Sequence, residues 1–180
     1  MSGLIEIKKK IYRGTDIYFK DIDLKRGKHY KDFGNGFYLA YQKEQSRKMA
    51  QKLMKAHKNN TGYIYTYNTV QAEIDRLYRI DKVRYFKEAD LDWIDFVLKS
   101  RKTFRLWHNY DVVIGPTADD DTKLVLNAYN EGLYGDPKSK KAKYILLEQL
   151  EVNNLGVQVF IATQAGLSIL DIDNREEERL

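Results

Sequence analysis

Two short segments near the start of the chain combine glycine with residues that can hold an anionic, flat ligand. The first is Ile11-Tyr12-Arg13-Gly14-Thr15, where an expected strand ends in a basic residue followed by glycine. A guanidinium binds phosphate or hydroxyl oxygens through a rigid set of donors. The second is the run 32–40, DFGNGFYLA, in which Gly34 and Gly36 allow unusual backbone angles and close approach of a ligand. Tyr38 in this run offers a stacking face for a heteroaromatic ring.

Three further positions could take part in chemistry, and each also has an ordinary structural explanation. Gln158 lies in an expected apolar strand, where a buried amide needs partners, so we interpret it as a site residue. The run Asp119-Asp120-Asp121 could supply a carboxylate, although adjacent Asp residues also suit a helix N-terminus. Ser46, eight residues after Tyr38, is either a ligand contact or an ordinary residue at the start of a helix.

Composition excludes several kinds of site. The chain has no cysteine, so it holds neither a disulfide nor a thiolate metal site. Its three histidines are too scattered to suggest a metal cluster, and we expect no metal cofactor. We expect His29 and His57 on the surface, and we consider His108, beside Trp107, for a pocket wall.

Charge is distributed unevenly along the chain, whose formal net charge is +5. Residues 1–60 contain 15 Lys or Arg against 6 Asp or Glu, whereas the remaining residues contain 16 against 20. A basic N-terminal third would attract a phosphate-bearing ligand, a nucleic acid or an acidic partner, or would form an ordinary solvated surface. No dedicated nucleic-acid motif accompanies it.

The elements that must position these residues indicate a single α+β domain over residues 1–180. We expect strands near residues 5–13, 36–40, 63–67, 77–86, 111–115, 157–162 and 167–172, and helices near 43–57, 89–101, 120–132 and 139–150. Residues 21–36 indicate an exposed loop and 174–180 a frayed or helical tail, while Trp93 and Phe96 are expected in the core. The order of elements is irregular and no GxGxxG follows a strand, which argues against a doubly wound dinucleotide-binding sheet. With no apolar leader and no run of about 18 apolar residues, a cytoplasmic protein is expected.

Five segments, in order along nearly the whole chain, resemble the ADP-ribosyltransferase superfamily. FGNGFYLA is similar to the FGKGIYFA stretch of poly-ADP-ribose polymerases. The likeness is closer to a family of small bacterial uncharacterised domains, often encoded as toxin–antitoxin partners. The matching segments are Tyr12–Thr15, DFGNGFYL at 32–39, Trp93–Val97, DVVIGPTADDD at 111–121 and Gln158–Thr163.

The resemblance implies an NAD+ cleft between two small packed β-sheets with flanking helices. It implies that Arg13 contacts the adenine-side ribose or phosphates, and that Gly14 holds the nicotinamide carboxamide through its backbone. Tyr38 would stack on the nicotinamide ring and Ser46 would hydrogen-bond the carboxamide. Met49 stands where the polymerases have a second tyrosine, and a thioether covers a ring less specifically. The implied binding set is Tyr12, Arg13, Gly14, Thr15, Gly36, Phe37, Tyr38, Ser46 and Met49.

The family's third element is a glutamate on a late strand, and Gln158 takes that position here. The implied catalytic set is Arg13, Tyr38 and Gln158, with Asp119, Asp120 or Asp121 as alternative carboxylates. A carboxylate stabilises developing positive charge, whereas a neutral amide only orients the sugar. Losing one preorganised contact of this kind costs ~3 kcal/mol, roughly 100-fold in rate.

The function implied by the resemblance is an NAD-dependent mono-ADP-ribosyltransferase, a bacterial toxin-antitoxin toxin that modifies a protein or nucleic-acid acceptor. NAD+ would be its substrate, and a cognate antitoxin its further partner. Two alternatives stay open. One is a non-catalytic NAD- or nucleotide-binding module of the same fold, and the other is a toxin that acts by sequestering a partner.

Overall fold

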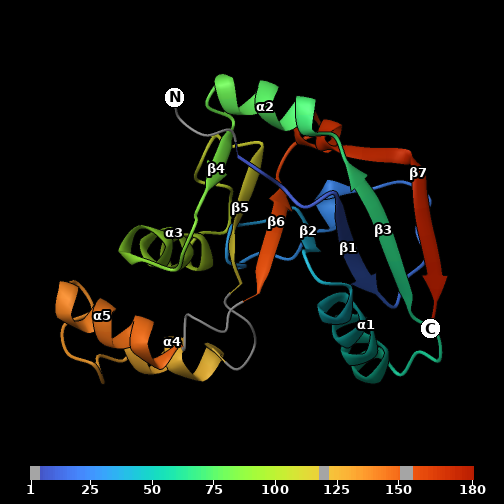
Figure 1. The fold of residues 1–180 in the computed structure, drawn as a ribbon. Helices are drawn as coiled ribbons and strands as arrows, with labels where there is room; N and C mark the ends of the chain where they lie inside the picture. Colours follow the sequence, from blue (N-terminus) through green and yellow to red (C-terminus); the bar gives the residue numbers. More distant parts are fainter. Residues whose placement is uncertain (1–4, 118–121, 151–155) are drawn as a thin grey trace.

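The computed structural model describes residues 5–117, 122–150 and 156–180, whose strands form one seven-stranded sheet (Figure 1). The sheet has the order β4-β5-β6-β2-β1-β3-β7. Its strands are β1 (Lys10–Thr15), β2 (Phe37–Ala40), β3 (Tyr63–Thr69), β4 (Val83–Tyr85), β5 (Val112–Pro116), β6 (Val157–Ile161) and β7 (Leu170–Arg179). The helices are α1 (Lys43–His57), α2 (Gln71–Arg79), α3 (Leu91–Lys102), α4 (Thr122–Asn130) and α5 (Lys140–Gln149), with short 3-10 turns η1 (Leu24–Arg26) and η3 (Ala165–Ile169). The α+β class is confirmed.

The sheet is mixed, and its pairing is weakest at its middle. Strands β4 and β5 are parallel, and every other neighbouring pair is antiparallel. β1 and β2 share one pair, Tyr12 with Ala40, whereas β1 pairs with β3 along its whole length. The resemblance implies two sheets, and here the structure differs. The strands form one continuous sheet that narrows to a single residue pair between β1 and β2.

Hydrophobic cores cover the two faces of the sheet. One contains Ile11, Leu39 and Ile114 together with Ile74 and Leu77 of α2. The other packs strand residues against α3, α4 and α5, which gather beside one end of the sheet in Figure 1. Trp93 is fully buried and Phe96 is buried in this second core, as expected from the sequence.

Helix α1 packs closely against β1 because of one glycine. A Cβ atom placed on Gly14 would lie 1.7 Å from the backbone oxygen of Ser46. That oxygen belongs to the helix backbone and cannot turn aside, so only glycine fits here. The contact fixes α1 beside the point where β1 and β2 part.

Several expected elements are present and others are wrong. Helix α1 has the expected bounds, but Met49 is 41% exposed and Ser46 takes the buried face beside Ala50. The expected strand 77–86 is wrong: α2 extends through Arg79 and only Val83–Tyr85 is a strand. The first turn of α2 is polar, so the helical spacing of its two buried residues, Ile74 and Leu77, is difficult to detect in the sequence.

The charged tail is a strand, which corrects the expectation of a frayed or helical end. β7 reaches Arg179 and pairs with β3, and its Glu176 and Glu178 form ion pairs with Lys10, Lys43 and Arg47. These ion pairs with β1 and α1, together with the backbone pairing to β3, accompany a polar sequence at the edge of the sheet, where charged residues are common. Within the described ranges, no helix has the length and apolar character needed to cross a bilayer.

Candidate functional site

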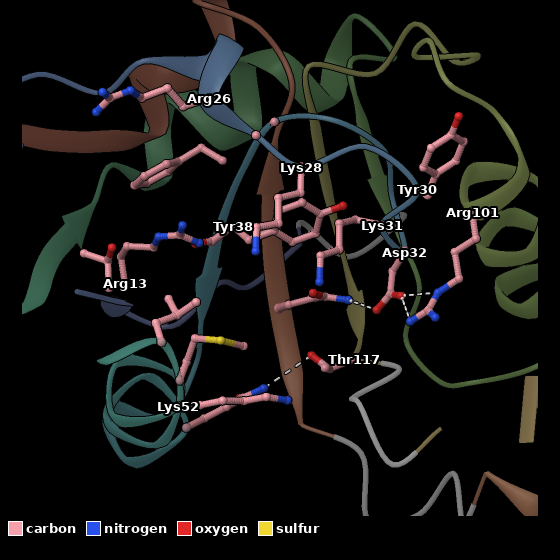
Figure 2. A pocket seen from close by; sticks show the side chains of 18 of the residues that line it. Arg13, Arg26, Lys28, Tyr30, Lys31, Asp32, Tyr38, Lys52, Arg101 and Thr117 are labelled. Carbon is pink, nitrogen blue, oxygen red and sulfur yellow. Dashed lines mark hydrogen bonds and ion pairs between the residues drawn. The ribbon is translucent and has the colours of Figure 1, made fainter. Parts of the chain in front are cut away.

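A pocket of about 960 Å³ opens where β1 and β2 part, with α1 forming one wall. Figure 2 shows the side chains that line it, with Arg13 at one side and Asp32 and Arg101 at the other. The sequence-predicted residues on its walls are Arg13, Thr15, Gly36, Phe37, Tyr38, Met49 and Gln158. Tyr12, Gly14 and Ser46 do not line the pocket. Gly14 and Ser46 pack against each other instead. The run Asp119–Asp121 lies outside the described residues.

Arg13 spans the gap in the sheet. Its Nη1 donates a hydrogen bond to the backbone oxygen of Tyr38 at 3.1 Å, and its guanidinium carbon lies 5.3 Å from the centre of the Phe37 ring. Its Nε is buried without a hydrogen-bond partner, and no carboxylate in the described ranges forms an ion pair with it. Burial lowers the pKa of this guanidinium, because the surrounding protein disfavours the charged form. An anionic ligand would supply a hydrogen-bond acceptor for Nε and a negative charge beside the guanidinium.

Tyr38 is fixed at both ends of its side chain. Its hydroxyl donates to the backbone oxygen of Gly34 at 2.8 Å and accepts from the amide of Phe33 at 3.0 Å. Its ring lies 4.9 Å from that of Phe160. Burial raises the pKa of this phenol well above its usual value, so the side chain is neutral. Tyr38 can therefore present a ring to a ligand but is poorly suited to proton transfer.

Gln158 lies in a charged network that the sequence did not reveal. Its Nε2 donates to Asp32 Oδ2 at 2.8 Å and to the backbone oxygen of Pro116 at 3.3 Å. The other oxygen of Asp32 accepts from Nε and Nη2 of Arg101 at 2.8 and 2.5 Å (Figure 2). Gln158 and Asp32 are both buried, so the amide finds the partners that its burial requires. The negative charge of Asp32 is thus compensated by the Arg101 cation and the Gln158 amide.

At the other end of α1 a second buried carboxylate meets a histidine. Asp16 Oδ2 accepts hydrogen bonds from His57 Nδ1 at 2.8 Å and Asn59 Nδ2 at 2.6 Å. The Asp16 side chain is 1% exposed and that of His57 is 47% exposed, as expected for a surface histidine. Burial opposes the charge of Asp16, but these hydrogen bonds outweigh it and lower its pKa. Because Nδ1 faces the carboxylate, Nε2 is left to face solvent or a ligand in the pocket.

His108 has a structural position instead of a place on the pocket wall. It is buried, its Nε2 donates to the backbone oxygen of Phe33 at 2.9 Å, and its Nδ1 accepts from the amide of Tyr110. Burial lowers its pKa, so the imidazole stays neutral. His108 thereby holds the same loop that fixes the Tyr38 hydroxyl.

Basic residues outnumber acidic ones on the pocket walls. The basic set is Arg13, Arg26, Lys28, Lys31, Lys48, Lys52, Arg101 and Lys102, and the acidic set is Asp16, Asp21, Asp23 and Asp32. Two of these carboxylates, Asp16 and Asp32, are already hydrogen-bonded within the protein. The excess of basic side chains on the pocket walls gives a positive electrostatic potential, which favours a negatively charged ligand. In the described part of the chain, no cluster of His, Asp and Glu is arranged to hold a metal ion.

Two ionic contacts in the pocket, Asp32 with Arg101 and Asp16 with His57, were not predicted from the sequence. Their partners lie far along the chain, 69 residues apart for Asp32 and Arg101 and 41 for Asp16 and His57. The one available signal is that Asp32 begins the DFGNGFYL run.

Comparison with known proteins places the chain without assigning an activity. Residues 9–172 match the family described as "Protein of unknown function (DUF3990)". No curated protein and no solved structure matches the chain. Since the match spans most of the sequence, including every described wall of the pocket, the chain belongs to the DUF3990 family.

Proposed function

We propose that this protein binds NAD+ in the pocket and transfers its ADP-ribose to a macromolecular acceptor. The observation that carries the proposal is Arg13, a partly buried side chain on the pocket wall whose Nε is buried without a hydrogen-bond partner, at the gap between β1 and β2. A buried donor left without an acceptor costs free energy, and an anionic ligand in the pocket would supply that acceptor together with a negative charge. The resemblance to ADP-ribosyltransferases supplies the identity of that ligand.

The length of the pocket supports a dinucleotide. Gln45, Met49, Leu53 and His57 are pocket-lining residues on one side of α1, which rises ~18 Å between the first and the last of them. Gln45 donates to Thr117 just beyond β5, so its end lies beside the strand that holds Gln158. A dinucleotide laid along this wall would have its nicotinamide riboside at Gln158 and its adenosine at His57.

Within this arrangement the residues have separate roles. Arg13 of β1 and Lys48 of α1 would bind the diphosphate, and the Tyr38 ring would contact nicotinamide. Gln158 donates its amide hydrogens within the protein, which directs its oxygen to accept from a ribose hydroxyl. In the reaction the C1′–N bond breaks, nicotinamide leaves with the electron pair, and an acceptor oxygen or nitrogen bonds C1′ and loses its proton.

A second candidate function is nucleotide binding without turnover. It is favoured by the compensated state of Asp32, whose charge is shared with Arg101 and Gln158 instead of facing the pocket alone. A carboxylate in this state stabilises a cationic sugar less than a single exposed glutamate does.

The test uses NAD+ labelled in its adenylate half, incubated with the protein and a cell extract. The enzyme proposal predicts nicotinamide release and label in macromolecules, which protease and nuclease digestion assigns to protein or nucleic acid. Calorimetry of NAD+ binding without extract separates the alternatives, because the binding module predicts heat of binding and no release. Arg13→Ala should abolish both signals, whereas Arg79→Ala, an exposed arginine of α2 outside the pocket, should change neither.

Growth arrest on expression tests the toxin role. If the arrest depends on the pocket, Arg13→Ala abolishes it. An arrest that persists unchanged in Arg13→Ala and Tyr38→Phe supports sequestration of a partner instead.

A further inference from the structure

A strongly basic surface containing exposed aromatic rings borders the pocket. It is formed by residues 25–31, KRGKHYK, and 102–105, KTFR, which we call the rim patch. Neither segment contains Asp or Glu, and together they carry six Lys or Arg. Arg26, Lys28 and Tyr30 also line the pocket (Figure 2), as does Lys102, so the patch is continuous with the pocket.

Contacts between His29 and Phe104 hold the two segments of the rim patch together. Their rings are stacked with centroids 4.0 Å apart and planes 16° from parallel, and His29 Nδ1 donates to the Phe104 backbone oxygen at 2.8 Å. The stack uses one side of the Phe104 ring and leaves this residue 57% exposed. The two segments therefore form one surface, although they lie far apart in the chain.

Tyr30 adds a second exposed ring. It is 53% exposed, its ring centroid lies 6.2 Å from that of Phe104, and Figure 2 shows its side chain turned away from Arg13. Its backbone has φ of 60°, a left-handed conformation that is unusual for a bulky residue.

Charge in the rim patch is available to a partner. Lys25, Arg26, Lys28, Lys102 and Arg105 are exposed, and none forms an ion pair with another described residue. Cations spaced around exposed rings match single-stranded nucleic acid, in which phosphates alternate with bases that can stack. The carboxylates of an acidic protein segment would pair with the cations but would give the two rings no stacking partner. The exposed rings therefore favour single-stranded nucleic acid over an acidic protein.

We propose that the rim patch binds single-stranded nucleic acid and presents it to the pocket as the acceptor of ADP-ribose. The acceptor role rests on the proposed transferase function, whereas binding of the strand does not. The phosphates would contact the patch cations, and unpaired bases would stack on Phe104 and Tyr30. A duplex hides its bases and would use the cations alone.

The test is fluorescence anisotropy with end-labelled oligouridylate and oligothymidylate, and with a duplex of equal length. The full chain should bind both single strands more tightly than the duplex, and binding should weaken as salt rises. Phe104→Ala combined with Tyr30→Ala should weaken single-strand binding by about 30-fold or more, since each of the two base stacks contributes a factor of about 5 to 150 and the factors multiply. Both residues are exposed, so the folded state should persist, as circular dichroism would verify.

The matched control is Lys140→Ala with Lys141→Ala, which removes two exposed cations of α5 outside the pocket and should leave binding unchanged. Lys28→Ala with Lys102→Ala should reduce the slope of log affinity against log salt by about 1.4 for a single strand. The proposal is overturned if the double aromatic variant binds like the original chain, or if polyglutamate binds more tightly than the oligonucleotides.

NAD+ calorimetry on the same preparations keeps the two proposals apart. Oligonucleotide binding that depends on the rings supports the rim patch even where NAD+ binding is absent, and then only the transferase proposal fails. Label transfer to protein alone, with none to the bound oligonucleotide, overturns the acceptor role.

Discussion

Gln158→Glu would place the glutamate of the ADP-ribosyltransferase signature into this pocket, and the structure predicts that the protein tolerates it poorly. The amide nitrogen of Gln158 lies 2.8 Å from Asp32 Oδ2 and donates to it. A carboxylate in its place would lose that hydrogen bond and put two like charges together. Two unit charges at that separation repel by about 6 kcal/mol at an effective dielectric constant of about 20.

Uptake of a proton is the less costly outcome at neutral pH. Holding a carboxyl with an ordinary pKa of about 4.3 in its neutral form costs about 1.4 kcal/mol for each pH unit above that value. The cost is about 1.6 kcal/mol near pH 5.5 and about 4.4 kcal/mol near pH 7.5, below the repulsion in both cases. The introduced carboxyl therefore has a raised pKa in the folded state. The variant's stability is fully present below the unfolded pKa and falls as pH rises.

Urea unfolding of Gln158→Glu and of the original chain at these two pH values measures the effect. We expect the stability deficit of the variant to grow by about 3 kcal/mol between them. A new hydrogen bond from the protonated group to Asp32 would reduce the deficit equally at both values. Gln164→Glu, an exposed position, should show no such growth. A deficit for Gln158→Glu that is the same at both pH values would refute the inferred contact with Asp32.

Three further predictions test the same site. Arg13→Met should leave the unfolding free energy unchanged or raise it by about 1 kcal/mol, because a partly buried cation with an unpartnered Nε is removed, while calorimetry should show loss of NAD+ binding. Gly14→Ala should destabilise by more than about 3 kcal/mol in thermal unfolding, since its Cβ would meet the Ser46 backbone, and near-original stability would contradict the close approach of α1. Asp16→Asn should cost about 1–2 kcal/mol at neutral pH. The pKa of Asp16 is lower in the folded than in the unfolded state, so its carboxylate stabilises the fold at pH values above the unfolded pKa of about 3.9. This contribution is lost on acidification, so the stability deficit of Asp16→Asn should shrink below about pH 4.

Local sequence signals predicted the fold where a pattern repeats over a full element. The apolar spacing of α1 gave its bounds, and the alternation in Tyr63–Tyr67 gave most of β3. The same reasoning failed at β7, whose strand is stabilised by charges on β1 and α1 instead of by alternating apolar residues. A strand that is stabilised by distant partners does not need an alternating apolar pattern in its own sequence.

The site was predicted only where a local sequence motif marks it, and its contacts between distant residues were not predicted. Arg13 and Tyr38 lie in short glycine-containing motifs that are visible in the sequence, and the structure brings both residues to one pocket. Asp32 lies within such a motif, yet its chemistry depends on Arg101 and Gln158, which approach only when α3 and β6 pack together. The amide at position 158 therefore does more than replace a glutamate. Once Asp32 occupies this corner of the pocket, a neighbouring donor stabilises its charge, whereas a second carboxylate would compete with it for protons.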